Sequence, residues 1–164
     1  MNEKFAKAQP WLGLAARVIL GGVLFAAGYL KAGTPDKSQM AVRAYEILPI
    51  SIANLLGLVL PFVEIAIGVL LILGTLTKAM AAFGGFTMVI FIIAISQAWA
   101  RGLNIDCGCF GGGGAVAPGQ TKYLQEILRD TGLAFLAIYL IRYPVTKFSL
   151  DKKPTAMNSQ KEVA

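Results

Sequence analysis

The sequence contains no histidine, only two cysteines and few charged residues. Closed zinc sites usually take four cysteine or histidine ligands, so two cysteines and no histidine argue against such a site built by this chain alone. Charged residues make up 15% of the 164 residues, against roughly 25% in an average soluble domain. The net charge is +6, but no basic run is interleaved with aromatic residues, so nucleic acid is not an expected partner.

Long apolar segments dominate the chain instead, with 56% hydrophobic residues and a mean hydropathy of +0.65. Four of them approach the ~20 residues that a helix needs to span a bilayer: 11–31, 52–73, 79–100 and 124–143. The first is longer than the apolar region of a signal peptide and carries Arg17, which favours a span. The sequence therefore predicts an all-α integral membrane protein, a four-helix bundle over residues 11–143 embedded in membrane lipid. Residues 1–10 and a disordered tail, 144–164, flank this domain.

Lysine and arginine in short flanking segments predict the orientation of these spans. Both termini should lie on one side, which would hold eight basic residues, Lys4, Lys7, Lys78, Arg142, Lys147, Lys152, Lys153 and Lys161. The opposite side would hold five, Lys31, Lys37, Arg43, Arg101 and Lys122. The bias predicts cytoplasmic termini in the inner membrane and an extracytoplasmic loop between residues 101 and 123.

Polarity and proline predict two further features, a short helix outside the spans and a kink within one of them. The segment 33–51 is too polar to span but has an apolar side, so we expect an interfacial helix that ends before Pro49. Within the second span, Pro61 lacks a backbone donor and crowds the carbonyl of Gly57, which predicts a kink.

Four ionisable residues fall inside predicted spans, where each charge costs at least about 2.5–3.5 kcal/mol: Arg17, Glu64, Arg129 and Asp130. Their depths allow an Arg17–Glu64 pair. The charges either pair to fix helix order or line a polar interior that relays protons or binds a quinone head group. Glu64 is the favoured proton carrier, because burial favours its neutral form.

Both cysteines lie in the motif Cys107-Gly108-Cys109, for which three interpretations compete. A redox pair is one: a disulfide between residues i and i+2 closes a cramped ring that is easily reduced, and Gly108 tolerates the backbone angles it requires. Capture of a soft metal such as copper or zinc is the second. The third is a structural loop, although so small a ring would stabilise weakly.

The residues around the motif modulate these interpretations. Asp106 raises and Arg101 lowers the pKa of a nearby thiol, so their effects oppose each other. Phe110 offers an apolar contact to a partner or a quinone ring, or anchors the loop at the interface. The four glycines 111–114 are expected to form a hinge that lets the thiols move.

The stretches "RVILGGVLFAAGYLKAG", "AYEILP", "LPFVEIAIGVLLILG", "DCGCFG" and "LRD" resemble the DoxX-like membrane proteins, specifically the branch of the methylamine-utilisation protein MauE. This resemblance implies a four-helix bundle in the cytoplasmic membrane, thiol redox chemistry and a thioredoxin-like partner. MauE is linked to maturation of a disulfide-rich periplasmic enzyme, and other DoxX relatives to sulfur oxidation and quinones. By resemblance, Cys107 and Cys109 form the redox pair, and Arg17, Glu64 and Asp130 line the interior.

The sequence thus predicts a membrane thiol:disulfide redox protein, possessing no covalent cofactor, that connects an extracytoplasmic thioredoxin-like partner with the quinone pool. Because the chain has no second cysteine pair, its electrons must pass to a lipid-soluble carrier or a separate protein. The alternatives are a noncatalytic assembly subunit for a redox or sulfur-metabolising complex, and a copper- or zinc-handling membrane protein.

Overall fold

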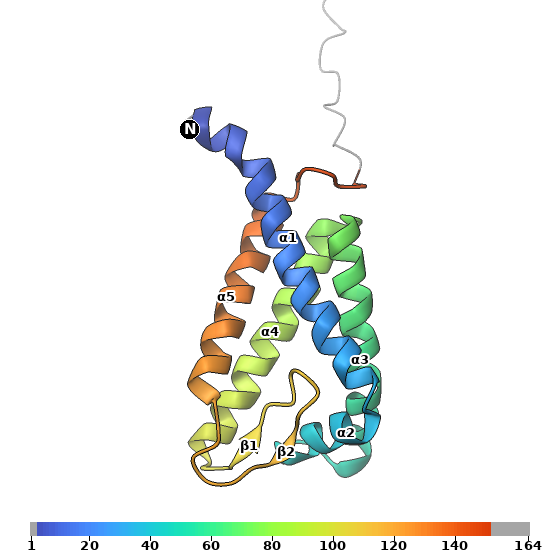
Figure 1. Cartoon of the computed structure of the whole chain (residues 1–164), viewed down its shortest axis with the longest axis vertical. Helices are drawn as coiled ribbons and strands as arrows, with labels where there is room; N and C mark the ends of the chain where they lie inside the picture. Colours follow the sequence, from blue (N-terminus) through green and yellow to red (C-terminus); the bar gives the residue numbers. More distant parts are fainter. Residues whose placement is uncertain (1–2, 152–164) are drawn as a thin grey trace, which may run out of the picture.

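The computed structural model describes residues 3–151, which form five helices and one two-stranded hairpin (Figure 1). Four helices are long and one is short: α1 (Glu3–Ala32), α2 (Pro35–Ala44), α3 (Ile50–Leu73), α4 (Thr77–Ala100) and α5 (Tyr123–Arg142). The antiparallel strands β1 (Ile105–Asp106) and β2 (Gly114–Ala115) form the hairpin. The fold is mainly helical as predicted, and the hairpin is an addition that the sequence did not indicate.

The four long helices run along the molecule, and all of them contribute to one apolar core (Figure 1). Its buried members are Ala16, Leu20, Leu24, Ile67, Leu71, Ala81, Met88, Leu133, Ala137 and Leu140. The start of α1 and the segment after α5 lie at one end of the molecule, whereas the hairpin and α2 lie at the other (Figure 1).

Small residues set the register of the antiparallel pair α1 and α3. A Cβ added to Gly21 would meet the backbone of Gly68, and one added to Gly28 would meet the carbonyl oxygen of Pro61. Glycine at these positions lets the two backbones approach closely, as in many pairs of membrane helices. The contacts place Gly21 opposite Gly68 and Gly28 opposite Pro61, and this register decides which charged side chains can meet.

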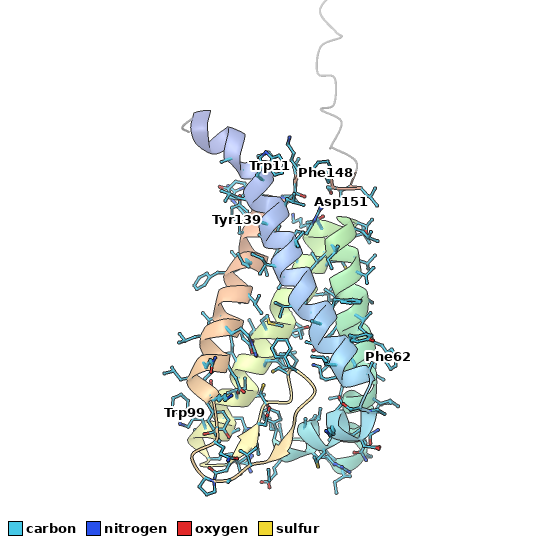
Figure 2. All side chains as sticks on the ribbon, in the orientation of Figure 1. Trp11, Phe62, Trp99, Tyr139, Phe148 and Asp151 are labelled. Carbon is cyan, nitrogen blue, oxygen red and sulfur yellow. The ribbon has the colours of Figure 1, made fainter. Side chains whose placement is uncertain are left out.

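Within residues 3–151, three helical segments are long and apolar enough to cross a membrane, Ala8–Ala32, Ile50–Leu73 and Thr77–Ala100. Their outward faces carry exposed bulky apolar side chains such as Phe62 and Phe86, which a lipid environment would cover. Trp11 and Trp99 lie half exposed at opposite ends (Figure 2), in keeping with the aromatic belts at membrane interfaces. These features make the chain a membrane protein.

Helix α5 is not among those three segments, because its 20 residues include four charged ones, Glu126, Arg129, Asp130 and Arg142. It nevertheless packs along α4 and supplies three members of the core. The predicted fourth span at 124–143 therefore corresponds to a helix that packs in the bundle, and its passage through the membrane stays a prediction.

The boundaries of the helices follow local signals. Pro35 opens α2, where its missing N–H is no loss. Gly74 ends α3 in a left-handed conformation at φ +70°, and the N–H of Thr75 donates to Leu70 O at 3.0 Å, a common helix stop. The interfacial helix expected within 33–51 is α2, which ends at Ala44, five residues before Pro49.

The segment after Pro144 differs from the predicted disordered tail. Residues 144–151 fold back over the start of α1, where the N–H of Lys147 donates to Pro10 O at 3.1 Å and Thr146 is buried. The carboxylate of Asp151 accepts hydrogen bonds from the N–H groups of Leu76 and Thr77 at 2.6 and 2.8 Å. The remainder of the predicted tail, 152–164, lies outside the described residues.

Candidate functional site

The two cysteines lie at the tip of the hairpin, between its strands. Ile105 pairs with Ala115 and Asp106 pairs with Gly114, so residues 107–113 form the connecting loop. This loop lies beside α2, at the end of the molecule opposite the N-terminus (Figure 1). Both thiols are therefore presented together by one short, closed turn.

The local geometry of the turn brings the two sulfurs together. The N–H of Cys109 donates to Cys107 Sγ at 3.2 Å, and the two thiol side chains are themselves hydrogen-bonded neighbours. Gly108 between them has φ +70°, and a Cβ at this position would collide with Ala41 of α2. Asp106 Oδ1 accepts the N–H of Gly108 at 2.9 Å, which holds the turn. Glycine at position 108 thus satisfies both the backbone angle and the close approach of α2.

The glycine run that follows packs tightly as well. A Cβ at Gly113 would collide with Ala41, and one at Gly114 would crowd Met40. Positive φ angles of +81°, +134° and +98° at Gly111, Gly113 and Gly114 also favour glycine. Close contact with α2 therefore accounts for these glycines, and their predicted action as a hinge stays a prediction.

Two tyrosines anchor the hairpin to the helices. The hydroxyl of Tyr123, at the start of α5, donates to Leu103 O at 2.5 Å and accepts the N–H of Ile105 at 3.1 Å. Tyr45 donates its hydroxyl to Cys107 O at 3.1 Å, and burial raises the pKa of Tyr45, so it stays protonated. The thiol turn is consequently held from both sides by buried or half-buried groups.

Cys107 is half-buried and faces two carboxylates. Ligand atoms of Asp106, Cys107 and Glu126 all lie within 4.8 Å of one another, and Glu126 also hydrogen-bonds the thiol. The hydrogen bond with Cys109 and then burial raise the pKa of the Cys107 thiol, to which the negative charge of Glu126 adds. Cys107 therefore stays a thiol at neutral pH unless a nearby group removes its proton.

Cys109 is buried and faces the interior of the helix bundle. It lines a small cavity together with Phe110, Arg129, Asp130 and Glu64. The guanidinium of Arg129 lies 4.9 Å from the centre of the Phe110 ring and interacts electrostatically with Cys109. A cation in this position stabilises a thiolate. The two sulfurs thus have different surroundings: Cys107 faces carboxylates and Cys109 faces an arginine.

Two ion pairs lie around this cavity, one with both side chains buried and one in which the arginine is 29% exposed. Lys31 Nζ is 2.6 Å from Glu64 Oε1, with side-chain exposures of 5% and 1%. Arg129 Nη2 is 2.8 Å from Asp130 Oδ1, and Asp130 is likewise buried. This arrangement places Arg129 and Asp130 in the wall of the cavity that Cys109 lines.

The expected pair of Arg17 with Glu64 is wrong. Arg17 instead donates to Thr146 Oγ1 at 2.8 Å and to the carbonyl oxygens of Lys147 and Phe148 at 3.3 and 3.1 Å. Glu64 pairs with Lys31. Arg17 therefore holds the C-terminal segment at the end of the molecule away from the thiols.

Register and side-chain direction explain this exchange of partners. The contacts of Gly21 and Gly28 place the level of Glu64 near Phe25, eight residues or about 12 Å from Arg17. Side chains on a helix tilt toward its N-terminus. In antiparallel helices this tilt turns Lys31 and Glu64 toward each other, whereas Arg17 and Glu64 turn apart. The direction of the side chains, together with the register of α1 and α3, therefore decides that Glu64 pairs with Lys31.

Three residues near the thiols were missed from the sequence: Lys31, Tyr45 and Glu126. Lys31 was assigned to a flank, yet it is 4% exposed and joins the interior pair. The sequence did offer one signal for this position: Lys31 lies in the last turn of an apolar helix, and its long apolar stem allows the side chain to be buried. Glu126 lies one turn before Arg129 and Asp130 on α5, which is the first helix after the cysteine loop.

A quinone does not fit the cavity beside Cys109. The cavity has a volume of about 10 Å³, the space of a single water molecule, and a quinone ring is several times larger. Phe110 lines this cavity, but it is exposed and its ring lies against the guanidinium of Arg129. The cavity beside Cys109 therefore does not support quinone binding there, and a quinone elsewhere on the chain stays a prediction.

Comparison with known proteins identifies relatives of the chain. The family described as methylamine utilisation protein MauE matches residues 9–143. A methylamine utilization protein MauE of Methylorubrum extorquens is 36% identical over 136 residues, 81% of this chain and 70% of that protein. The one from Paracoccus denitrificans is 32% identical over 106 residues, 64% of this chain and 57% of that protein.

A third relative, from Methylophilus methylotrophus, carries the same description and is 25% identical over 155 residues, 92% of this chain and 79% of that protein. No solved structure matches the chain. The family match covers the four long helices and the hairpin with its two cysteines. The chain belongs to the MauE family.

Proposed function

We propose that this chain is a membrane thiol:disulfide redox protein that exchanges disulfides with an extracytoplasmic thioredoxin-like or disulfide-rich protein through Cys107 and Cys109. The relatives are described as methylamine utilization proteins, and a role in that process is part of the proposal. The observation that carries it is the pairing of the two thiols in one turn, with Cys107 half-exposed and Cys109 buried.

The environments of the sulfurs suggest separate roles in the exchange. A partner thiolate attacks Cys107 Sγ of the Cys107–Cys109 disulfide, forming a mixed disulfide while the electron pair of the broken bond passes to Cys109. Arg129 stabilises the departing Cys109 thiolate. A second partner thiolate then attacks the partner sulfur of the mixed disulfide and displaces Cys107, which takes a proton through Glu126. The Cys109 thiolate takes up a second proton, one of the two that the partner dithiol released on becoming thiolates. The partner leaves oxidised, the chain is left with two thiols, and all steps are reversible.

The proposed location is the inner membrane, with four spans, cytoplasmic termini and the thiol turn outside. Support comes from the eight-to-five division of basic residues and from the position of the hairpin at the end opposite the N-terminus. A membrane-impermeant thiol reagent added to intact cells tests this sidedness. Labelling of Cys107 is expected; labelling only after the cells are opened would place the turn in the cytoplasm.

The exchange is tested by trapping the mixed disulfide in cells. In a Cys109→Ala variant, Cys107 should accumulate in a covalent complex that reducing agent releases, whereas Cys107→Ala should give little. The trapped protein identifies the partner. If neither variant forms such a complex, and if the redox state of the cysteines in the unaltered protein never changes, the chain acts as an assembly subunit instead.

Metal handling is a second candidate because Asp106, Cys107 and Glu126 converge within 4.8 Å. Three protein ligands are enough for an open zinc site. This function predicts stoichiometric copper or zinc in the purified protein and its loss in both Cys107→Ser and Glu126→Gln. Redox exchange predicts that metal content does not depend on Glu126.

A further inference from the structure

Two buried carboxylates share the cavity that Cys109 lines. Glu64 and Asp130 are each 1% exposed, and both line that cavity. Each uses one oxygen in its ion pair, Oε1 toward Lys31 and Oδ1 toward Arg129. The second oxygens, Glu64 Oε2 and Asp130 Oδ2, have no hydrogen-bond partner among residues 3–151.

Such an arrangement is unusual for a purely structural pair of salt bridges. Buried polar atoms almost always have a hydrogen-bond partner, and each exception requires an explanation. A free carboxylate oxygen can accept a proton, and a cavity the size of one water lets a proton pass between groups that line it without touching. Each ion pair uses one oxygen of its carboxylate and leaves the second oxygen without a partner.

The charged groups around the cavity come from three helices, and Glu126 of α5, beside Cys107, also interacts electrostatically with Arg129 and Asp130. Helix α1 contributes Lys31, α3 contributes Glu64, and α5 contributes Arg129 and Asp130, whereas α4 contributes the uncharged Met88 and Phe91. Lys31 also interacts electrostatically with Asp130. Of these groups, Arg129 interacts electrostatically with Cys109 and can stabilise a thiolate that forms transiently there.

We infer that Glu64 and Asp130 form an internal proton acceptor that serves Cys109 specifically. The inference rests on the proposed thiol exchange and concerns the step in which Cys109 attacks a mixed disulfide on Cys107. The Cys109 thiol gives its proton to the carboxylate pair, its sulfur forms the bond to Cys107 Sγ, and the partner sulfur departs with the electron pair of the broken bond. The partner thiolate takes a proton from solvent, and the carboxylate pair later releases its own.

The step can be followed in the purified protein with an aromatic disulfide reagent, dithionitrobenzoate. Reaction at the more accessible Cys107 releases one coloured thionitrobenzoate, and attack by Cys109 releases a second. The first release reports that the turn is folded and that Cys107 is reactive. The rate of the second release measures the attack of Cys109 on the mixed disulfide. Cys109→Ala should give only the first release, which assigns the two phases.

Asp130→Asn and Glu64→Gln are expected to slow the second release by roughly 100-fold, a typical contribution of a proton acceptor, while leaving the first unchanged. Asp36→Asn, an exposed carboxylate on α2, is the matched control and should change neither. An unchanged second release in both folded variants overturns the inference and leaves the thiol exchange standing. Absence of any second release in the unaltered protein overturns both.

A measurement on the unaltered protein covers the case in which the variants do not fold. If the proton goes to an internal group, the rate of the second release should not depend on buffer concentration at constant pH and ionic strength. A rate that rises in proportion to the concentration of buffer base would show that the buffer takes the proton, and the inference would be wrong.

Discussion

Removal of the Lys31 ammonium tests the interior ion pair directly. Lys31→Met leaves Glu64 with an uncompensated charge in a site where its side chain is 1% exposed, which costs about 3–5 kcal/mol in buried pairs. That corresponds to a loss of roughly 100-fold to several thousand-fold in the folding equilibrium constant. Asp130 loses the same neighbouring cation, so the upper half of this range is expected.

The reverse change should cost less. In Glu64→Met the ammonium of Lys31 keeps the electrostatic interaction with Asp130 and lies 5.3 Å from the centre of the Phe91 ring, a contact worth about 2 kcal/mol when desolvated. The double variant Lys31→Met/Glu64→Met removes both charges and should recover most of the stability, because apolar residues replace buried pairs at little cost.

Equilibrium unfolding in detergent micelles measures all three variants, with Lys37→Met on the exposed side of α2 as control. The reasoning fails if Lys31→Met is as stable as the unaltered protein. It also fails if the double variant is as unstable as the sum of the two single ones, since that result would mean that the two side chains do not interact.

Three further changes follow from the contacts around the turn and the C-terminal segment. Asp151→Asn weakens the cap on α4 and should cost about 1 kcal/mol at pH 7; burial tends to raise the pKa of Asp151, but hydrogen bonds from α4 lower it overall. Its stabilisation is therefore present above about pH 4 and disappears as pH falls through the lowered folded value, so thermal unfolding of the variant and of the unaltered protein should converge in acid. In Gly108→Ala the new residue must adopt φ +70°, which costs about 1–2 kcal/mol, and its side chain also meets Ala41. Thermal unfolding should show a loss of stability of at least this size, and Ala41→Gly should restore only the part due to the collision. Cys109→Ala removes the hydrogen bond that raises the pKa of Cys107 most. Alkylation of Cys107 should therefore reach its half-maximal rate at a lower pH than in a Cys109→Ser control. If the two pH values are equal, the hydrogen bond is not the cause of the raised pKa.

Much of the helical architecture could be predicted because its signals are local. Apolar runs of about 20 residues gave the long helices, Pro35 and Gly74 mark helix ends, and the polar segment between the first two spans gave the short helix α2. Gly108 was expected to tolerate backbone angles that a small disulfide ring would require, and in the structure its φ is +70°.

The partners of the charged residues could not be read in the same way. The assignment of Glu64 to Arg17 used depth along each span, but the pair with Lys31 depends on the register set by Gly21 and Gly28 and on the tilt of the side chains. Glu126 beside Cys107 depends likewise on how the hairpin folds against α5. Residues 144–151 looked like an irregular tail because their contacts, with Arg17 and the start of α4, lie more than 70 residues away in sequence.

By itself the sequence determined that this chain is helical, suited to a membrane, and equipped with two thiols in one turn, because composition, periodicity and residue spacing act over short distances along the chain. Only the tertiary structure decided that Cys107 faces Glu126 while Cys109 faces Arg129 and the buried carboxylates. The physical reason is that the environment of a charge or a thiol is set by atoms from several helices, whose relative register and direction no single segment specifies.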